Sequence, residues 1–211
     1  MKYAYVYVLD TMADWELGFV IAELNSGQYF KNRGSRLPVK TVGASKRPIT
    51  TKGGVTVVPD VMVDEIPHET AAILLLPGAD RWNDPEHAPI VETAKQLLDA
   101  GGNVAAICGA TAALANAGLL DKRKHTSNSL DYLTMFCPTY KGAAFYQDEQ
   151  IVVDGNLITT SAAGSLLLAR EVIALLDLFK KDTLEAWYRY FQTGDGRYFF
   201  TMMETMQEQE G

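Results

Sequence analysis

The chain has 211 residues, of which 47% are apolar and 21% are charged, a composition typical of a globular protein with a sizeable core. Its 19 basic and 26 acidic residues give a net charge of −7, and the longest basic run is Lys122-Arg123-Lys124, so nucleic acid is not an expected partner. The N-terminus shows no signal-like segment and no stretch of 18 residues is purely apolar, so we expect a cytoplasmic protein without a membrane partner.

The first third of the chain predicts a strand, a helix and a hairpin. Residues 3–9 carry β-branched or aromatic side chains on both faces, which is typical of a central strand in a sheet covered on both sides by helices. A helix is expected to follow, with Asp14 as its N-cap and Gly27 at its end. Residues 36–64 favour a strand and a small hairpin around Gly53-Gly54.

The middle of the chain alternates buried strands with helices. A strand over residues 71–76, a helix over 88–100, a strand over 103–107 and a helix over 111–117 follow one another with short loops. This order predicts an α/β fold with a mainly parallel sheet and helices on both faces.

Later segments predict an edge hairpin and two helices. Asp154-Gly155 lies between apolar runs and indicates a hairpin that adds two antiparallel strands at an edge of the sheet. Residues 165–179 are apolar nearly all round, which indicates a buried helix, and a second helical segment is expected over 182–192.

No repeat or linker divides the chain, so residues 1–211 are expected to form a single domain, with 180–211 as a helical C-terminal extension or tail. The last eleven residues hold three glutamates and three methionines. We expect a frayed acidic tail there, because chain ends are usually loosely held; the alternative is a docking segment for a second subunit.

Cys108 is the main candidate for chemistry. It ends the strand over 103–107 and precedes a helix, and Gly109 permits the sharp turn of a nucleophile elbow. The N–H groups of Gly109 and Ala110 would lie at the helix N-terminus, where they favour a thiolate and lower its pKa. The alternative is a small buried hydrophobe, and Cys137 is expected to be structural or incidental.

Two further elements are predicted at the same carboxyl edge of the sheet. Trp15 and Glu16 follow the first strand, and burial of Glu16 behind the Trp15 ring would raise its pKa and let the protonated acid donate to a thiolate. The turn that contains Gly78 and Ala79 allows backbone N–H groups to approach a carbonyl oxygen, as an oxyanion hole requires. The alternatives are a first-turn carboxylate that favours the helix dipole and a plain strand-ending turn.

The segment Ala-Ala-Ile-Cys-Gly-Ala at 105–110, followed by 117–123, resembles the cysteine elbow and following helix of the DJ-1/PfpI superfamily. Three more pieces extend the resemblance over most of residues 1–179: Glu16, the Leu-Pro-Gly turn at 76–78, and residues 153–159. The resemblance implies a flavodoxin-like three-layer sandwich, similar to class I glutamine amidotransferases, and a homodimer. It also implies that Cys108 is the nucleophile, Glu16 its carboxylate partner, and Gly78 with Gly109 the backbone of the oxyanion hole.

The chain departs from the family pattern at its histidine positions. Many members carry a histidine directly after the cysteine, where this chain has Gly109, or at the end of a Thr-Thr-His segment, where it has Asn128. His125 comes three residues earlier, on the opposite face of an extended segment. Without an imidazole, acyl transfer lacks its usual proton acceptor.

We therefore expect an enzyme with a reactive Cys108 and a small-molecule substrate, either hydrolase- or amidase-like or glyoxalase- or deglycase-like. The alternatives are an oxidative-stress sensor or chaperone-like protein that uses oxidation of Cys108, and a binding protein that keeps the pocket without turnover. Trp15 and Asn128 are the candidate pocket residues of the site under each of these hypotheses. No metal and no cofactor are expected, because no Cys, His or acid spacing resembles a metal site and His68 and His87 are predicted at the surface.

Overall fold

The computed structural model describes residues 1–207. Its main sheet has seven strands: β1 (Tyr3–Tyr7), β2 (Val39–Gly43), β5 (Val61–Met62), β6 (Ala71–Leu76), β7 (Val104–Ile107), β8 (Ile151–Asp154) and β9 (Leu157–Thr160). The strand order is β5-β2-β1-β6-β7-β9-β8, and every neighbouring pair is parallel except β8 with β9. The predicted α/β fold with a mainly parallel sheet is therefore confirmed.

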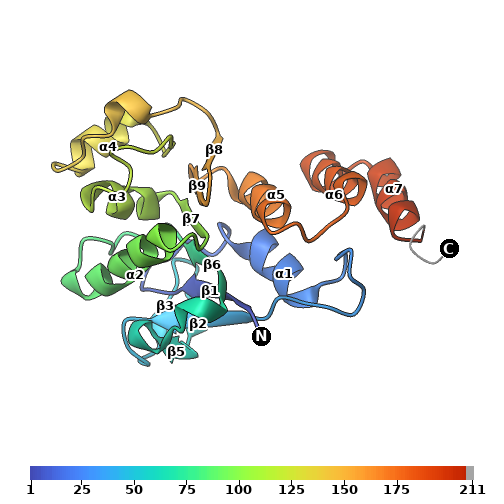
Figure 1. Ribbon diagram of the computed structural model, residues 1–211, viewed down its shortest axis with the longest axis horizontal. Helices are drawn as coiled ribbons and strands as arrows, with labels where there is room; N and C mark the ends of the chain where they lie inside the picture. Colours follow the sequence, from blue (N-terminus) through green and yellow to red (C-terminus); the bar gives the residue numbers. More distant parts are fainter. Residues whose placement is uncertain (208–211) are drawn as a thin grey trace.

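Helices cover both faces of this sheet. Helices α2 (Ala88–Asp99) and α3 (Gly109–Asn116) lie on one face, and α1 (Gly18–Ser26) and α5 (Ser165–Leu175) lie on the other (Figure 1). The strands between them are buried on both sides, and in β6 the last four residues are fully enclosed. No helix within residues 1–207 is long and apolar enough to span a membrane.

Short elements complete the connections between the strands and helices. They are α4 (Leu130–Phe136) and the 3₁₀ turns η1 (Val63–Glu65), η2 (His68–Thr70), η3 (Pro85–His87) and η4 (Ala143–Phe145). Four of these five elements are single turns, so most of the regular structure lies in the sheet and the longer helices.

The predicted hairpin around residues 53–54 is present as a separate antiparallel pair, β3 (Ile49–Thr50) with β4 (Thr56–Val57). It explains why Asp14 is not the N-cap of α1. The Asp14 carboxylate accepts hydrogen bonds from Thr51 Oγ1 at 2.5 Å and Gly53 N at 2.6 Å, so it anchors the hairpin, and α1 begins only at Gly18.

The hairpin at Asp154-Gly155 is also present, but it adds one antiparallel strand to the sheet and not two. Strand β9 pairs parallel to β7, with Val104 opposite Leu157, and only β8 runs antiparallel. The long connection after β7 crosses over the sheet through α3, so the chain re-enters in the parallel direction.

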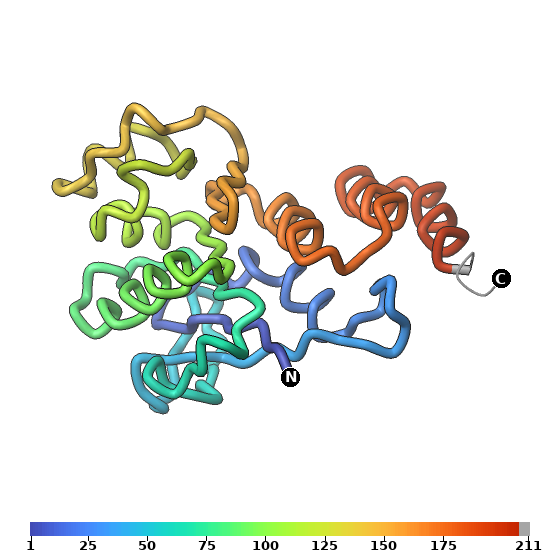
Figure 2. Tube along the Cα trace, viewed as in Figure 1, coloured from blue at the N-terminus to red at the C-terminus, as the bar shows by residue number. Residues whose placement is uncertain are grey.

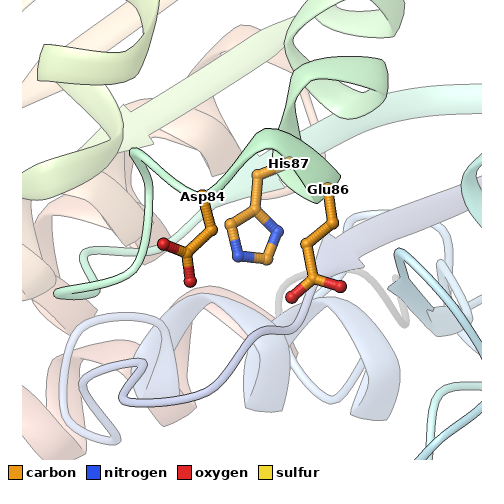
Figure 3. Close-up of side chains that lie close together, drawn as sticks. All are labelled: Asp84, Glu86 and His87. Atoms are coloured by element: carbon orange, nitrogen blue, oxygen red, sulfur yellow. The ribbon is translucent and has the colours of Figure 1, made fainter.

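His87 is buried, with 4% of its surface exposed, although the sequence placed it at the surface. Its Nδ1 lies 2.7 Å from the Tyr7 hydroxyl, beneath β1. Burial lowers the pKa of His87 and raises that of Tyr7, so both groups are neutral at neutral pH. Figure 3 shows the ring between the side chains of Asp84 and Glu86. His68 is exposed, as predicted.

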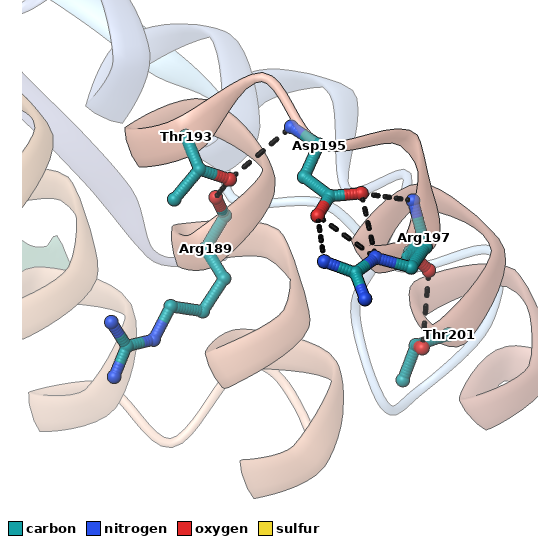
Figure 4. A network of polar contacts seen from close by, with 5 residues as sticks. All are labelled: Arg189, Thr193, Asp195, Arg197 and Thr201. Atoms are coloured by element: carbon teal, nitrogen blue, oxygen red, sulfur yellow. Dashed lines mark hydrogen bonds and ion pairs between the residues drawn. The ribbon is translucent and has the colours of Figure 1, made fainter.

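The C-terminal extension forms two helices, α6 (Lys181–Thr193) and α7 (Gly196–Gln207), which lie beyond α5 (Figure 2). The Asp195 carboxylate accepts hydrogen bonds from the backbone and guanidinium of Arg197 at the turn between them (Figure 4). Met202 is 1% exposed, so the prediction of a frayed tail is wrong for residues 201–207. The rest of that predicted tail, residues 208–211, lies outside the described residues.

Candidate functional site

Cys108 lies at a sharp turn between β7 and α3. Its backbone has φ 55° and ψ −121°, a conformation that costs a residue with a side chain about 1–3 kcal/mol. Neighbouring hydrogen bonds fix this turn: Cys108 N donates to Thr160 O at 3.0 Å, and Thr111 Oγ1 donates to Cys108 O at 2.6 Å. The thiol is therefore held at the carboxyl edge of the sheet, the position expected from the sequence, and it is half-buried there.

Glu16 approaches Cys108 from the loop after β1. It precedes α1 and does not lie in its first turn, and its side chain is 1% exposed. Its Oε2 accepts a hydrogen bond from Gly78 N, while Oε1 is buried and makes no hydrogen bond within residues 1–207 that meets the usual geometric limits. A Cβ at Gly78 would lie 2.6 Å from Cys108 Cβ and 2.7 Å from each Glu16 oxygen, so the carboxyl group and the thiol are close neighbours across this glycine.

Burial sets the proton affinities of both groups. It raises the pKa of Glu16, against the opposing effect of the Gly78 N–H. Burial also raises the pKa of the Cys108 thiol, and an ionised Glu16 raises it further by its charge and by accepting a hydrogen bond from the thiol, while the Asn128 amide and the Gly109 N–H lower it. The expectation of a lowered thiol pKa is therefore corrected: the loss of water around the sulfur outweighs its place before a helix. A proton on Glu16 removes the repulsion and leaves the carboxyl group able to donate to the thiolate.

The two candidate pocket residues differ in their relation to the sulfur. Asn128 Nδ2 donates to Cys108 Sγ at 3.4 Å, and its Oδ1 accepts from Ala162 N at 3.0 Å, so the amide is held against the thiol. Trp15 is 55% exposed, so it is not the ring that buries Glu16; the turn at Gly78 encloses that carboxyl group.

Of the three backbone N–H groups predicted for the oxyanion hole, those of Gly78, Ala79 and Gly109, the structure leaves two as candidates. The Gly78 N–H is bonded to Glu16 and is not free to hold an oxyanion. The Ala79 N–H makes no hydrogen bond within residues 1–207, and the Gly109 N–H is directed at the Cys108 side chain. Ala79 and Gly109 therefore remain as the candidate oxyanion donors, while Gly78 positions Glu16.

No imidazole of this chain lies at the thiol. His125 is fully buried, with Nδ1 2.7 Å from Arg123 O and Nε2 2.7 Å from the Tyr140 hydroxyl. His87 is bonded to Tyr7 and His68 is exposed in η2, and these are the only three histidines in the sequence.

One group of potential metal ligands was not apparent from sequence spacing. Oxygen and nitrogen atoms of Asp84, Glu86 and His87 lie within 4.8 Å of one another beside a cavity of about 280 Å³ (Figure 3). Arg81 pairs with Asp84 at 3.3 Å and Arg47 lines the same cavity, so positive charge already faces these carboxylates. We assign no metal there.

Aromatic residues near the site were also missed by the sequence analysis. Trp82, Tyr132 and Phe136 line a second cavity, which Gly109 and Ala79 border. Ser129 is the residue from which helix α4 could have been predicted, because serine is a common N-cap. Its hydroxyl caps the helix by accepting a hydrogen bond from Tyr132 N at 2.9 Å.

Comparison with known proteins identifies the family of this chain. The DJ-1/PfpI family matches residues 2–175. The chain is 48% identical over 202 residues to the Bacillus subtilis protein named "Uncharacterized protease YoaZ", covering 96% of both. It is 34% identical over 133 residues to "Deglycase TK1284" of Thermococcus kodakarensis, covering 61% of this chain and 76% of that protein. The crystal structure of a thiJ/pfpI family protein from Bacillus anthracis superposes with a TM-score of 0.93 at 50% identity, covering 96% of each chain. The chain therefore belongs to the DJ-1/PfpI family.

Proposed function

We propose that this protein is a cysteine-dependent enzyme that acts on small carbonyl compounds, with glyoxalase- or deglycase-like chemistry. The observation that carries the proposal is that Cys108 is paired with a buried carboxyl group and with no imidazole. A single carboxyl group that gives and takes a proton suits thiol addition to an aldehyde, because this step needs no second base. The relative named as a deglycase supports the same class of chemistry.

The reaction with an α-oxoaldehyde illustrates what the residues would do. The Cys108 thiolate adds to the aldehyde carbon, the C–S bond forms, and the carbonyl electron pair moves to oxygen, which takes the proton of Glu16. The Glu16 carboxylate then removes the hydrogen of that carbon and returns it to the adjacent ketone carbon, while the hydroxyl proton passes to the ketone oxygen. Water hydrolyses the resulting thioester, which releases an α-hydroxy acid and restores the thiol. The net reaction converts one oxoaldehyde and one water molecule into one α-hydroxy acid, so no oxidant is needed.

The backbone would stabilise the charge that develops in this addition. In this proposal the N–H groups of Ala79 and Gly109 would donate to the oxygen of a carbonyl that Cys108 attacks, and such fixed donors are worth several kcal/mol in a site that excludes water. Cleavage of a peptide would also require protonation of an amine leaving group, for which the site offers only Glu16. Aldehyde addition is therefore the better match to the geometry.

Methylglyoxal provides the test. Wild-type protein is expected to convert it to lactate, measured by NMR, and Cys108→Ala is expected to abolish this conversion. Cys137→Ser is the matched control, because Cys137 is buried and its Sγ donates a hydrogen bond to Ala112 O at 3.4 Å. Lactate formation that persists in Cys108→Ala would contradict the proposal.

A second candidate function is an oxidation sensor. It is favoured by the Ala79 N–H, which makes no hydrogen bond within residues 1–207, and by the Gly109 N–H beside the sulfur, which together would bind the oxygens of a sulfinate on Cys108. Mild peroxide should then add oxygen atoms to Cys108 before it oxidises Met203 or Met206, as peptide mass measurement would show. Early methionine oxidation with Cys108 untouched would rule the sensor out.

A further inference from the structure

A cavity of about 270 Å³ borders Gly109, the residue that follows Cys108. It lies between the turn after β6 and the helices α3 and α4, and its lining residues are Ala79, Asp80, Trp82, Asn83, Gly109, Ala112, Tyr132 and Phe136. Two of these residues, Ala79 and Gly109, carry the N–H groups left as oxyanion donors. Cys108 itself does not line the cavity, but charge on its sulfur acts on Tyr132 in the cavity wall and raises the pKa of that hydroxyl, so the thiol and the cavity are near neighbours.

Three of the eight lining residues are aromatic: Trp82, Tyr132 and Phe136. Trp82 is buried, and its Nε1 donates to Pro77 O at 2.8 Å while its ring lies 5.5 Å from that of Tyr7. On the opposite side, the rings of Tyr132 and Phe136 are 5.1 Å apart. An apolar cavity of about 150 Å³ is enough for a benzene ring, so this one has room for a ring with a short substituent.

The charges around the cavity favour a neutral occupant. Asp80 at the rim opposes an anion, and its ion pair with Lys52 at 3.2 Å weakens its attraction for a cation. The Tyr132 hydroxyl makes no hydrogen bond within residues 1–207. Burial, with the nearby charges of Cys108 and Glu16, raises the pKa of Tyr132, so this wall stays uncharged at neutral pH.

We infer that this cavity is the substrate pocket of the site, and that it takes a neutral group of the size of one aromatic ring, carried by the carbonyl compound that Cys108 attacks. The inference rests on the proposed function, because it assumes that Cys108 reacts with small carbonyl compounds. It assigns the substrate class to arylated or similarly bulky apolar carbonyl compounds.

Two thiol reagents test the inference without knowledge of the natural substrate. The rate of Cys108 alkylation by N-benzyliodoacetamide is divided by the rate with iodoacetamide, and this ratio is normalised to the same ratio for free cysteine. The wild-type protein is expected to prefer the benzyl reagent about tenfold, equivalent to about 1.4 kcal/mol. Ala112→Leu, which fills the cavity, should bring the normalised ratio down to about one.

Phe136→Ala supplies an independent variant if the larger side chain at residue 112 disturbs the fold. Phe136 is 55% exposed, so its truncation puts little of the core at risk, and the normalised ratio should fall severalfold. Met135→Ala is the matched control, because Met135 is the preceding residue of α4, is 74% exposed and does not line the cavity; it should keep the wild-type ratio.

The outcomes separate the two proposals. A wild-type ratio close to that of free cysteine, or a preference that survives both pocket variants, overturns the pocket while leaving a reactive Cys108 intact. A Cys108 that reacts with iodoacetamide no faster than the buried Cys137 overturns the proposed function and the pocket together.

Discussion

The Glu16 carboxyl group and the Cys108 side chain meet across the backbone of Gly78. A Cβ at that glycine would lie 2.6 Å from Cys108 Cβ and 2.7 Å from both carboxylate oxygens. Distances below 3.0 Å are essentially never found for a real Cβ atom, so the absence of a side chain at this position is what allows the two functional groups to approach. The turn after β6 thus determines how closely a carboxyl group can approach the thiol.

Gly78→Ala should therefore reduce Cys108-dependent turnover of methylglyoxal. The added methyl group must displace Glu16 or Cys108, and a misplacement of about 1 Å at a reacting group costs about 100-fold in rate. The measurement is kcat/KM. Gly18→Ala is the control, because a Cβ there meets nothing within 4 Å; it should leave the rate unchanged. Wild-type turnover in Gly78→Ala would show that this contact does not position the site.

The backbone at Cys108 predicts an unusual order of stabilities. Glycine adopts the positive φ of 55° without strain, whereas alanine retains the strain of the wild type. Cys108→Gly should therefore be more stable than Cys108→Ala by about 1 kcal/mol in chemical denaturation, although glycine inside an ordinary helix is less stable than alanine by a similar amount. The opposite order would mean that the turn at Cys108 is not strained.

Glu23 is expected to make stability depend on pH. The carboxyl group is buried under α6, where its Oε1 accepts a hydrogen bond from Trp187 Nε1 at 2.9 Å and its Oε2 is unpaired within residues 1–207. Burial raises the folded-state pKa of Glu23 above the ordinary value of 4.5. The neutral carboxyl group therefore contributes its full stability to the fold when the pH is below the ordinary pKa of 4.5. This contribution is lost as the pH rises through the folded-state pKa.

Glu23→Gln should remove this loss, so its free energy of unfolding should exceed that of the wild type at pH 7 and match it at pH 4. Glu23→Leu leaves the Trp187 N–H without an acceptor and should be less stable than Glu23→Gln by about 1–3 kcal/mol at both pH values. Denaturant titrations at the two pH values measure the differences, and other buried acids cancel in the comparison. An equal difference between wild type and Glu23→Gln at pH 4 and pH 7 would show that Glu23 does not titrate between them.

The sequence predicted the sheet and its flanking helices because buried strands and short connecting loops leave few alternatives. It misplaced the start of α1 because Asp14 resembles an N-cap locally, while its actual partners, Thr51 and Gly53, come from a distant hairpin. The sequence analysis placed His87 at the surface because no local pattern reveals its hydrogen bond with the Tyr7 hydroxyl. Long-range partners account for both errors.

The candidate site was predictable where it depends on strand ends and was not where it depends on side-chain packing. Cys108 and Glu16 each follow a parallel strand, so the fold alone brings them to one edge. The bond from Gly78 N to Glu16, and the raised pKa of the thiol, depend on burial that the sequence does not display. The aromatic wall at Tyr132 belongs to a seven-residue helix in a long connection, for which periodicity gives no clear signal.

The central claim is that protonated Glu16 stabilises the Cys108 thiolate. Its most direct test is to measure the rate of Cys108 alkylation as a function of pH in the wild type, Glu16→Gln and Glu16→Leu. Gln keeps a hydrogen-bond donor and Leu removes it. The account therefore predicts a small rise of the Cys108 pKa with Gln and a larger one with Leu, which slows alkylation at neutral pH by about tenfold, or about 1.4 kcal/mol. A Cys108 pKa that falls in both variants would show that Glu16 is ionised and repels the thiolate, and three coincident profiles would show that the two side chains do not interact; either result contradicts the account.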